Sequence, residues 1–178
     1  KSILGINLKV NQGFVEDWDP WWRDFLLKAH MSIIWLYRKN TLRLVISAEL
    51  LKLSGVSVVL NSKDRSRDAA KLTVKVKYIL YELQKLKDRE KDVLKRLAQA
   101  EDAGIPVLRL AYEKLSHASV ALAERFVLYR ARCSKTCRGR REDIAKKQHN
   151  KRLNETVENF DELKAALKGT EFEWMLKG

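Results

Sequence analysis

The sequence predicts an all-α protein, an elongated bundle of three long helices. Apolar residues recur at spacings of three and four over long stretches, as they do on one face of an α-helix. The 178 residues include only seven glycines and two prolines, too few for a turn-rich β-sandwich. We therefore expect a single helical domain over residues 1–178, with short extended N- and C-terminal arms.

The first predicted helix spans residues 19–54. Asp19 can cap its N-terminus and Pro20 suits the first helical position. Gly55 suits the position that follows the last turn. Between them the chain is apolar almost all round, and a helix of this kind is usually buried on several sides. We expect this helix to take part in self-association or in binding a related subunit.

The second and third predicted helices span residues 63–103 and 105–152. Each carries apolar residues at alternating steps of four and three, the pattern of a heptad seam. A short Gly104-Ile105-Pro106 turn separates them. Two seams joined by a tight turn predict an antiparallel helical hairpin.

The two ends of the chain have different patterns. Residues 1–18 form the predicted N-terminal arm, in which Leu4, Ile6, Leu8 and Val10 alternate with other residues as in a strand. Residues 153–178 contain a short amphipathic helix, Val157–Leu167, which Gly169 ends, and then the C-terminal arm. We expect both arms to contribute to assembly.

Positive charge is concentrated in one part of the chain, residues 125–152, which we call the basic segment. It holds eleven basic and two acidic residues, a net charge of +9 out of +13 for the whole chain. Arginine side chains match phosphate geometry, and each neutralised phosphate releases condensed counterions. The sequence therefore predicts nucleic acid as the partner, with duplex DNA favoured and RNA possible. The predicted contacts are Arg125, Arg130, Arg132, Lys135, Arg138, Arg140, Arg141, Lys146, Lys147, Lys151 and Arg152.

Tryptophans gather near the start of the first predicted helix, with one more near the C-terminus. Aromatic rings can stack on unpaired bases, and they are also common anchors of subunit interfaces. Because the first predicted helix is apolar on every side, we favour the interface. The predicted interface residues are Trp18, Trp21, Trp22, Trp35 and Trp174.

No pattern of catalytic or metal-binding residues is present in the sequence. Cys133 and Cys137 lie four residues apart, but no further ligands follow at a usable spacing. The glycines stand alone, so there is no phosphate-binding glycine-rich loop. We expect a non-enzymatic protein that needs no cofactor and no metal.

No targeting or membrane-spanning segment is visible in this chain. The most apolar stretch, Phe25–Tyr37, contains Lys28 and His30 and is shorter than the roughly 20 apolar residues that a span needs. We expect the protein in a nucleoprotein particle such as a virion, or inside the cell.

The predicted chain is basic, has long helices and extended ends, and is rich in Lys, Glu, Ile and Leu over residues 63–115. In this general layout it resembles the nucleocapsid proteins of filamentous archaeal viruses, which wrap double-stranded DNA. The resemblance implies a self-assembling structural subunit that coats or packages nucleic acid. Two other functions stay open: a small helical RNA-binding subunit of an RNA-guided or RNA-processing complex, and a secreted basic protein that acts on anionic surfaces. Co-purifying duplex DNA, RNA, or no nucleic acid would distinguish the three.

Overall fold

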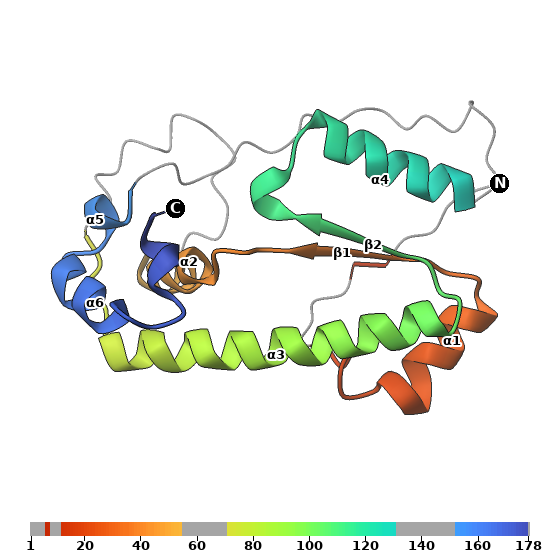
Figure 1. The fold of residues 1–178 in the computed structure, drawn as a ribbon, viewed down its shortest axis with the longest axis horizontal. Coiled ribbons are helices and arrows are strands. Elements are labelled where there is room, and N and C mark those ends of the chain that lie inside the picture. Colours follow the sequence, from red (N-terminus) through yellow and green to blue (C-terminus); the bar gives the residue numbers. More distant parts are fainter. Residues whose placement is uncertain (1–5, 8–11, 55–70, 131–151, 178) are drawn as a thin grey trace. The chain divides into compact units, whose positions relative to one another are not determined.

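The computed structural model describes residues 6–7, 12–54, 71–130 and 152–177 (Figure 1). Contacts divide the chain into two compact units. Unit 1 comprises Lys1–Lys39 and Asp88–Arg141, and unit 2 comprises Asn40–Lys87 and Glu142–Gly178. The long helix α3 (Val76–Asp102) contributes its C-terminal half to unit 1 and its N-terminal half to unit 2.

The predicted bundle of three long helices is wrong, although the described chain is mostly helical. Of the three predicted helices, only the second forms one long helix within the described residues. The other two are interrupted by strands β1 and β2, which pair with each other.

The first predicted helix, residues 19–54, is divided into helix, strand and helix. A π-helical turn (Trp18–Trp22) continues into α1 (Arg23–Lys28). Helix α1 ends just before His30, whose positive φ of 50° cannot continue a right-handed helix. The chain then extends as β1 (Ile33–Tyr37), five apolar residues rich in the β-branched and aromatic types that favour strands.

The third predicted helix, residues 105–152, begins instead with a strand. β2 (Val107–Ala111) pairs with β1 in parallel, with Ile33 opposite Val107. A 3₁₀ turn (Tyr112–Lys114) and α4 (His117–Arg130) follow. The predicted helical hairpin is therefore wrong, because its turn leads from a helix into a strand; residues 131–151 of that prediction lie outside the described residues.

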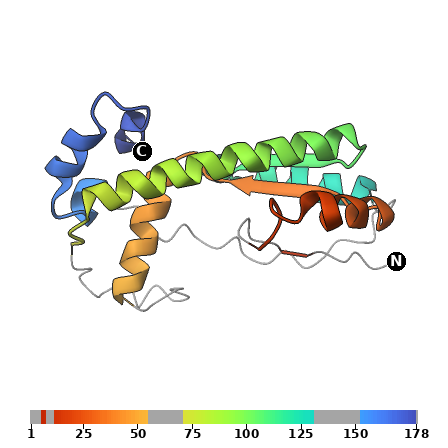
Figure 2. The ribbon, with the colours of Figure 1, turned by 90° about the horizontal axis from the view of Figure 1, so that it is seen from below.

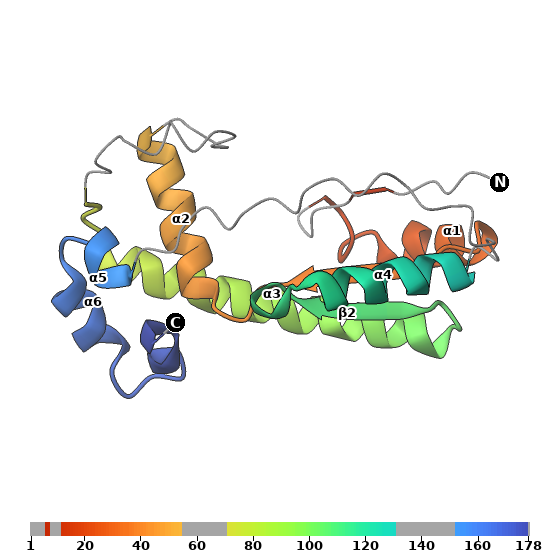
Figure 3. The same ribbon diagram turned by 90° about the horizontal axis from the view of Figure 1, so that it is seen from above.

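Unit 1 places the two strands between two helices. The C-terminal half of α3 lies on one side of the strands and α4 on the other, as the views from below and above both show (Figures 2 and 3). Val93, Leu97 and Ala100 of α3 are buried in the core of unit 1, and Ile33 and Trp35 of β1 pack against this core. Alternate residues of β1 therefore turn toward α3.

Unit 2 is built from helices around a second core. Helix α2 (Thr41–Ser54), the first half of α3, α5 (Leu153–Thr156) and α6 (Phe160–Leu167) contribute to it, together with a 3₁₀ helix (Glu173–Lys177). Leu72 forms a bridge with Val157 just before α3 begins. Helix α6 confirms the short helix predicted near the C-terminus, and Gly169 follows it with a φ of 73°.

The seam of the second predicted helix is buried as expected, but against different partners. Ile79 and Leu83 belong to the core of unit 2, whereas Val93 and Leu97 belong to the core of unit 1. Gly104, with a φ of 80°, follows the end of α3 as predicted. The seam thus serves two separate cores rather than a coiled-coil partner.

The predicted extended C-terminal arm is wrong. Phe172 and Met175 are 8% and 7% exposed and lie in the core of unit 2. The Asn40 side-chain amide donates a hydrogen bond of 2.8 Å to the Met175 carbonyl. The end of the described chain is therefore a folded part of unit 2.

The predicted N-terminal arm is only partly described. Ile6 and Asn7 are exposed, and residues 1–5 and 8–11 lie outside the described residues. Phe14 and Trp18 are buried in the core of unit 1. The last part of the predicted arm is therefore core structure too.

Candidate functional site

The predicted nucleic-acid contacts fall largely outside the described residues. Arg125 is exposed on α4, Arg130 is the last residue of that helix, and Arg152 is exposed just before α5. The others lie outside the described residues: Arg132, Lys135, Arg138, Arg140, Arg141, Lys146, Lys147 and Lys151.

Basic residues elsewhere are often neutralised by nearby carboxylates. Four arginines of unit 1 make such pairs: Arg109 with Glu101 at 2.6 Å, Arg89 with Glu16 at 2.9 Å, Arg96 with Asp19 at 3.1 Å and Arg23 with Asp24 at 3.4 Å. Among the described residues, neither Arg125 nor Arg152 has an ion-pair partner. The unpaired positive charge therefore includes both described ends of the basic segment.

The pKa shifts of described residues reflect these ion pairs. Arg109 donates two hydrogen bonds to Glu101, and this contact lowers the pKa of the Glu101 carboxyl and raises the pKa of Arg109. A hydrogen bond to Glu49 raises the pKa of Lys52. Each shift favours the charged form of the residue, which strengthens the pair.

Candidate metal ligands do not cluster in the part of the chain that the structure describes. His30 lies in the turn after α1, and His117 is the first residue of α4. Cys133, Cys137 and His149 lie outside the described residues.

The five tryptophans of the predicted subunit interface are not equivalent. Trp18 is fully buried in the core of unit 1, so its indole cannot meet another chain while unit 1 is folded. Trp21 and Trp174 are about half exposed, at 51% and 50%. Trp22 and Trp35 are partly buried and pack against the core of unit 1.

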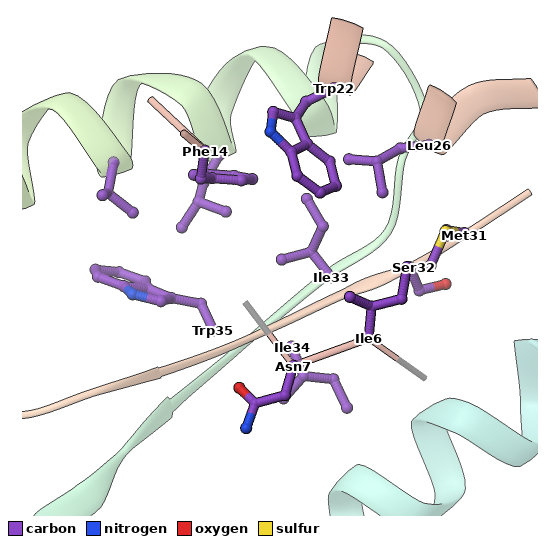
Figure 4. A pocket seen from close by; sticks show the side chains of 12 residues that line it. Ile6, Asn7, Phe14, Trp22, Leu26, Met31, Ser32, Ile33, Ile34 and Trp35 are labelled. Carbon is purple, nitrogen blue, oxygen red and sulfur yellow. The ribbon is translucent and has the colours of Figure 1, made fainter. Parts of the chain in front are cut away.

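Trp22 and Trp35 line a pocket in unit 1 (Figure 4). Its volume is about 190 Å³, and Phe14, Leu26, Ile33 and other apolar side chains form most of its wall. Asn7 and Ser32 supply its polar side chains. The sequence showed the aromatic residues but not the pocket, because the residues that form its wall are up to 91 positions apart, from Ile6 to Leu97.

Exposed apolar side chains lie on the face of β1 opposite Ile33 and Trp35, and one more lies on α4. Ile34 and Leu36 of β1 are 41% and 54% exposed, and Leu122 of α4 is 49% exposed. None of the described side chains of α4 is fully buried. The sequence does not indicate this exposure, because Ile34 and Leu36 lie in the apolar first predicted helix and Leu122 lies in the seam of the third.

The comparisons with known proteins found no matching family model, no similar curated protein and no similar solved structure. Within the described residues, no helix combines the length and the apolar character needed to cross a membrane.

Proposed function

We propose that this protein binds nucleic acid without catalysing a reaction, and that the basic segment, residues 125–152, contacts the phosphates. The observation that carries the proposal is the distribution of charge. The segment holds eleven basic and two acidic residues, and its described residues Arg125 and Arg152 have no ion-pair partner among the described residues. A polyanion supplies the missing negative charge.

The ion pairs of unit 1 support this assignment. Arg89, Arg96 and Arg109 on the other elements are paired with carboxylates. A nucleic acid would have to displace those carboxylates before it gained a phosphate contact. Arg125 and Arg152 of the basic segment have no ion-pair partner among the described residues, so a phosphate would bind them without displacing a carboxylate.

Self-assembly on the nucleic acid is the second part of the proposal. The resemblance to viral nucleocapsid proteins was based on a layout of long helices with extended ends and on the composition of residues 63–115. Because the described residues do not form a bundle of three long helices, this layout no longer supports a coat-protein role. The exposed side chains of Ile34 and Leu36, two positions apart on one face of β1, support assembly instead, because neighbouring exposed apolar side chains are typical of protein–protein contacts.

The test of phosphate binding is the salt dependence of affinity, measured by fluorescence anisotropy on labelled nucleic acid. If six to ten phosphates are neutralised, affinity should fall by about 10³–10⁵ between about 50 and 200 mM salt. Replacing Arg138, Arg140 and Arg141 with Gln should reduce the slope of log K against log salt by about 2 to 3, since each lost contact contributes about 0.9.

A charge-matched control keeps this experiment specific. Lys75, Lys77 and Lys95 are exposed and have no ion-pair partner among the described residues. Their replacement with Gln removes the same total charge, yet it should change the slope much less. Equal slopes for the two triple variants would show that net charge, not the basic segment, causes binding.

A further inference from the structure

The aromatic pocket of unit 1 has the properties of a site for a flat, uncharged ring. Phe14, Trp22 and Trp35 contribute rings to its wall, and no charged side chain lines it (Figure 4). The rest of its wall is mostly aliphatic. A charged group placed there would lose its hydration without gaining a partner.

The size of the pocket also fits a ring. A dry apolar cavity of about 150 Å³ accepts a benzene molecule. The pocket has a volume of about 190 Å³ and is partly open to solvent. It can therefore hold a planar heterocycle whose polar edge stays near the opening.

Two polar side chains of the lining are available to such an edge. Neither the Asn7 amide nor the Ser32 hydroxyl makes a hydrogen bond within the described residues. The Asn7 amide offers both donors and an acceptor, and the Ser32 hydroxyl can act as either. An apolar wall with a few polar groups is typical of ligand sites.

We propose that this pocket takes one unstacked base of a nucleic acid. The inference rests on the proposed function, because the basic segment would hold the phosphates of the same strand. Aromatic side chains bind unpaired bases by stacking, and they do so without strong sequence preference. The protein should therefore favour single-stranded or locally opened nucleic acid over a fully paired duplex, since a paired base must first be unstacked.

The first experiment compares a single-stranded oligothymidine with an abasic oligomer of equal length. Wild-type protein should bind oligothymidine at least about fivefold more tightly, the lower end of what one stacked base contributes. The Trp35→Leu variant should lose this preference while its affinity for the abasic oligomer stays the same. Trp174→Leu is the matched control, because Trp174 lies in unit 2 and outside the pocket, and it should keep the full preference.

A second variant guards against misfolding of Trp35→Leu. Asn7 is exposed and Ser32 is partly buried, and neither is hydrogen-bonded within the described residues, so Asn7→Ala with Ser32→Ala should fold normally. This double variant should also lower the preference for oligothymidine. An unchanged preference in both pocket variants, with helicity retained by circular dichroism, would overturn the proposal.

Binding of a free nucleoside, which lacks phosphates, tests base binding in the pocket separately from phosphate binding by the basic segment. The fluorescence of 2-aminopurine deoxyriboside, excited outside tryptophan absorption, should be quenched by wild-type protein and not by Trp35→Leu. Quenching without any binding of the abasic oligomer at low salt would support the pocket and refute the phosphate contacts. Binding of naphthalene in the pocket without quenching of the nucleoside would show an apolar ligand site and overturn the base assignment.

Discussion

Replacement of Phe172 with Ala should destabilise unit 2 strongly, although the sequence places this residue in a terminal arm. Phe172 is 8% exposed and belongs to the core that Leu163 and Leu167 also form. Loss of a buried phenylalanine ring costs about 3–5 kcal/mol, through lost transfer free energy and the cavity left behind. We expect a decrease of that size in the free energy of unfolding of unit 2.

Truncation after Gly169 should have a larger effect than the point variant. It removes Phe172 and Met175 together and leaves the Asn40 amide, which donates to the Met175 carbonyl, without this partner. A buried methionine contributes about 2–5 kcal/mol, so the two side chains together account for at least about 5 kcal/mol. Small domains have total stabilities of about 5–15 kcal/mol, and we expect the truncated unit 2 to be largely unfolded.

Urea denaturation can follow the two units separately. Trp174 lies in unit 2, whereas the other four tryptophans lie in unit 1, so ¹⁹F NMR of fluorotryptophan-labelled protein reports on each. Lys177→Ala is the control, because Lys177 is exposed on the same 3₁₀ helix and should change stability by no more than about 0.5 kcal/mol. A loss below about 1 kcal/mol for Phe172→Ala would refute the assignment of this residue to the core.

Three further outcomes follow from particular residues. Glu101→Gln should lower the melting temperature at neutral pH, because the contact with Arg109 lowers the pKa of the Glu101 carboxyl from its ordinary value of 4.5 in the folded state. Measured by thermal unfolding across pH, the difference from wild type should vanish as the pH falls through that lowered pKa. Gly104→Ala should cost about 1–2 kcal/mol in urea denaturation, since Gly104 has a φ of 80° and an added Cβ meets no atom within 4 Å, which leaves backbone strain as the whole cost. Replacement of Cys133 and Cys137 with Ser should leave the zinc and iron content unchanged by elemental analysis, and a stoichiometric metal lost in the double variant would contradict this.

The features that local sequence determines were predicted well. The buried positions of α3 follow from its apolar spacing, and glycines at 104 and 169 do adopt the positive φ expected after a helix. Helix α6 was found from its amphipathic pattern. Each of these signals lies within a few residues of the structure that it predicts.

The strands were missed because their pairing is not local. Ile33–Tyr37 is a run of apolar residues, and periodicity alone cannot distinguish a buried strand from a helix in so short a run. Its partner, Val107–Ala111, begins 74 residues later. Leu108, Tyr112 and Leu115 also have helical spacing, yet pairing with β1 prevails over the helical preference of this stretch.

The sequence also does not predict which tryptophan side chains are exposed. Trp18 and Trp21 are three positions apart, yet one is fully buried and the other about half exposed. Which face of the π-helical turn meets the core depends on Val93 and Leu97 of α3, more than 70 residues away. The aromatic content therefore predicted a contact surface, but not which rings form it.

Helix α3 and the basic segment differ in how acidic and basic residues are mixed along the chain. Helix α3 mixes both signs of charge, and Lys85 with Glu82 and Lys91 with Asp88 form ion pairs one turn apart. In the basic segment only Glu142 and Asp143 are acidic, against eleven basic residues. Internal pairing can neutralise only a small part of its charge, and the remaining cations repel one another within about one Debye length. Under the proposed function a bound polyanion would remove that repulsion, so binding to the segment should be favoured at low salt and lost as salt screens the charges.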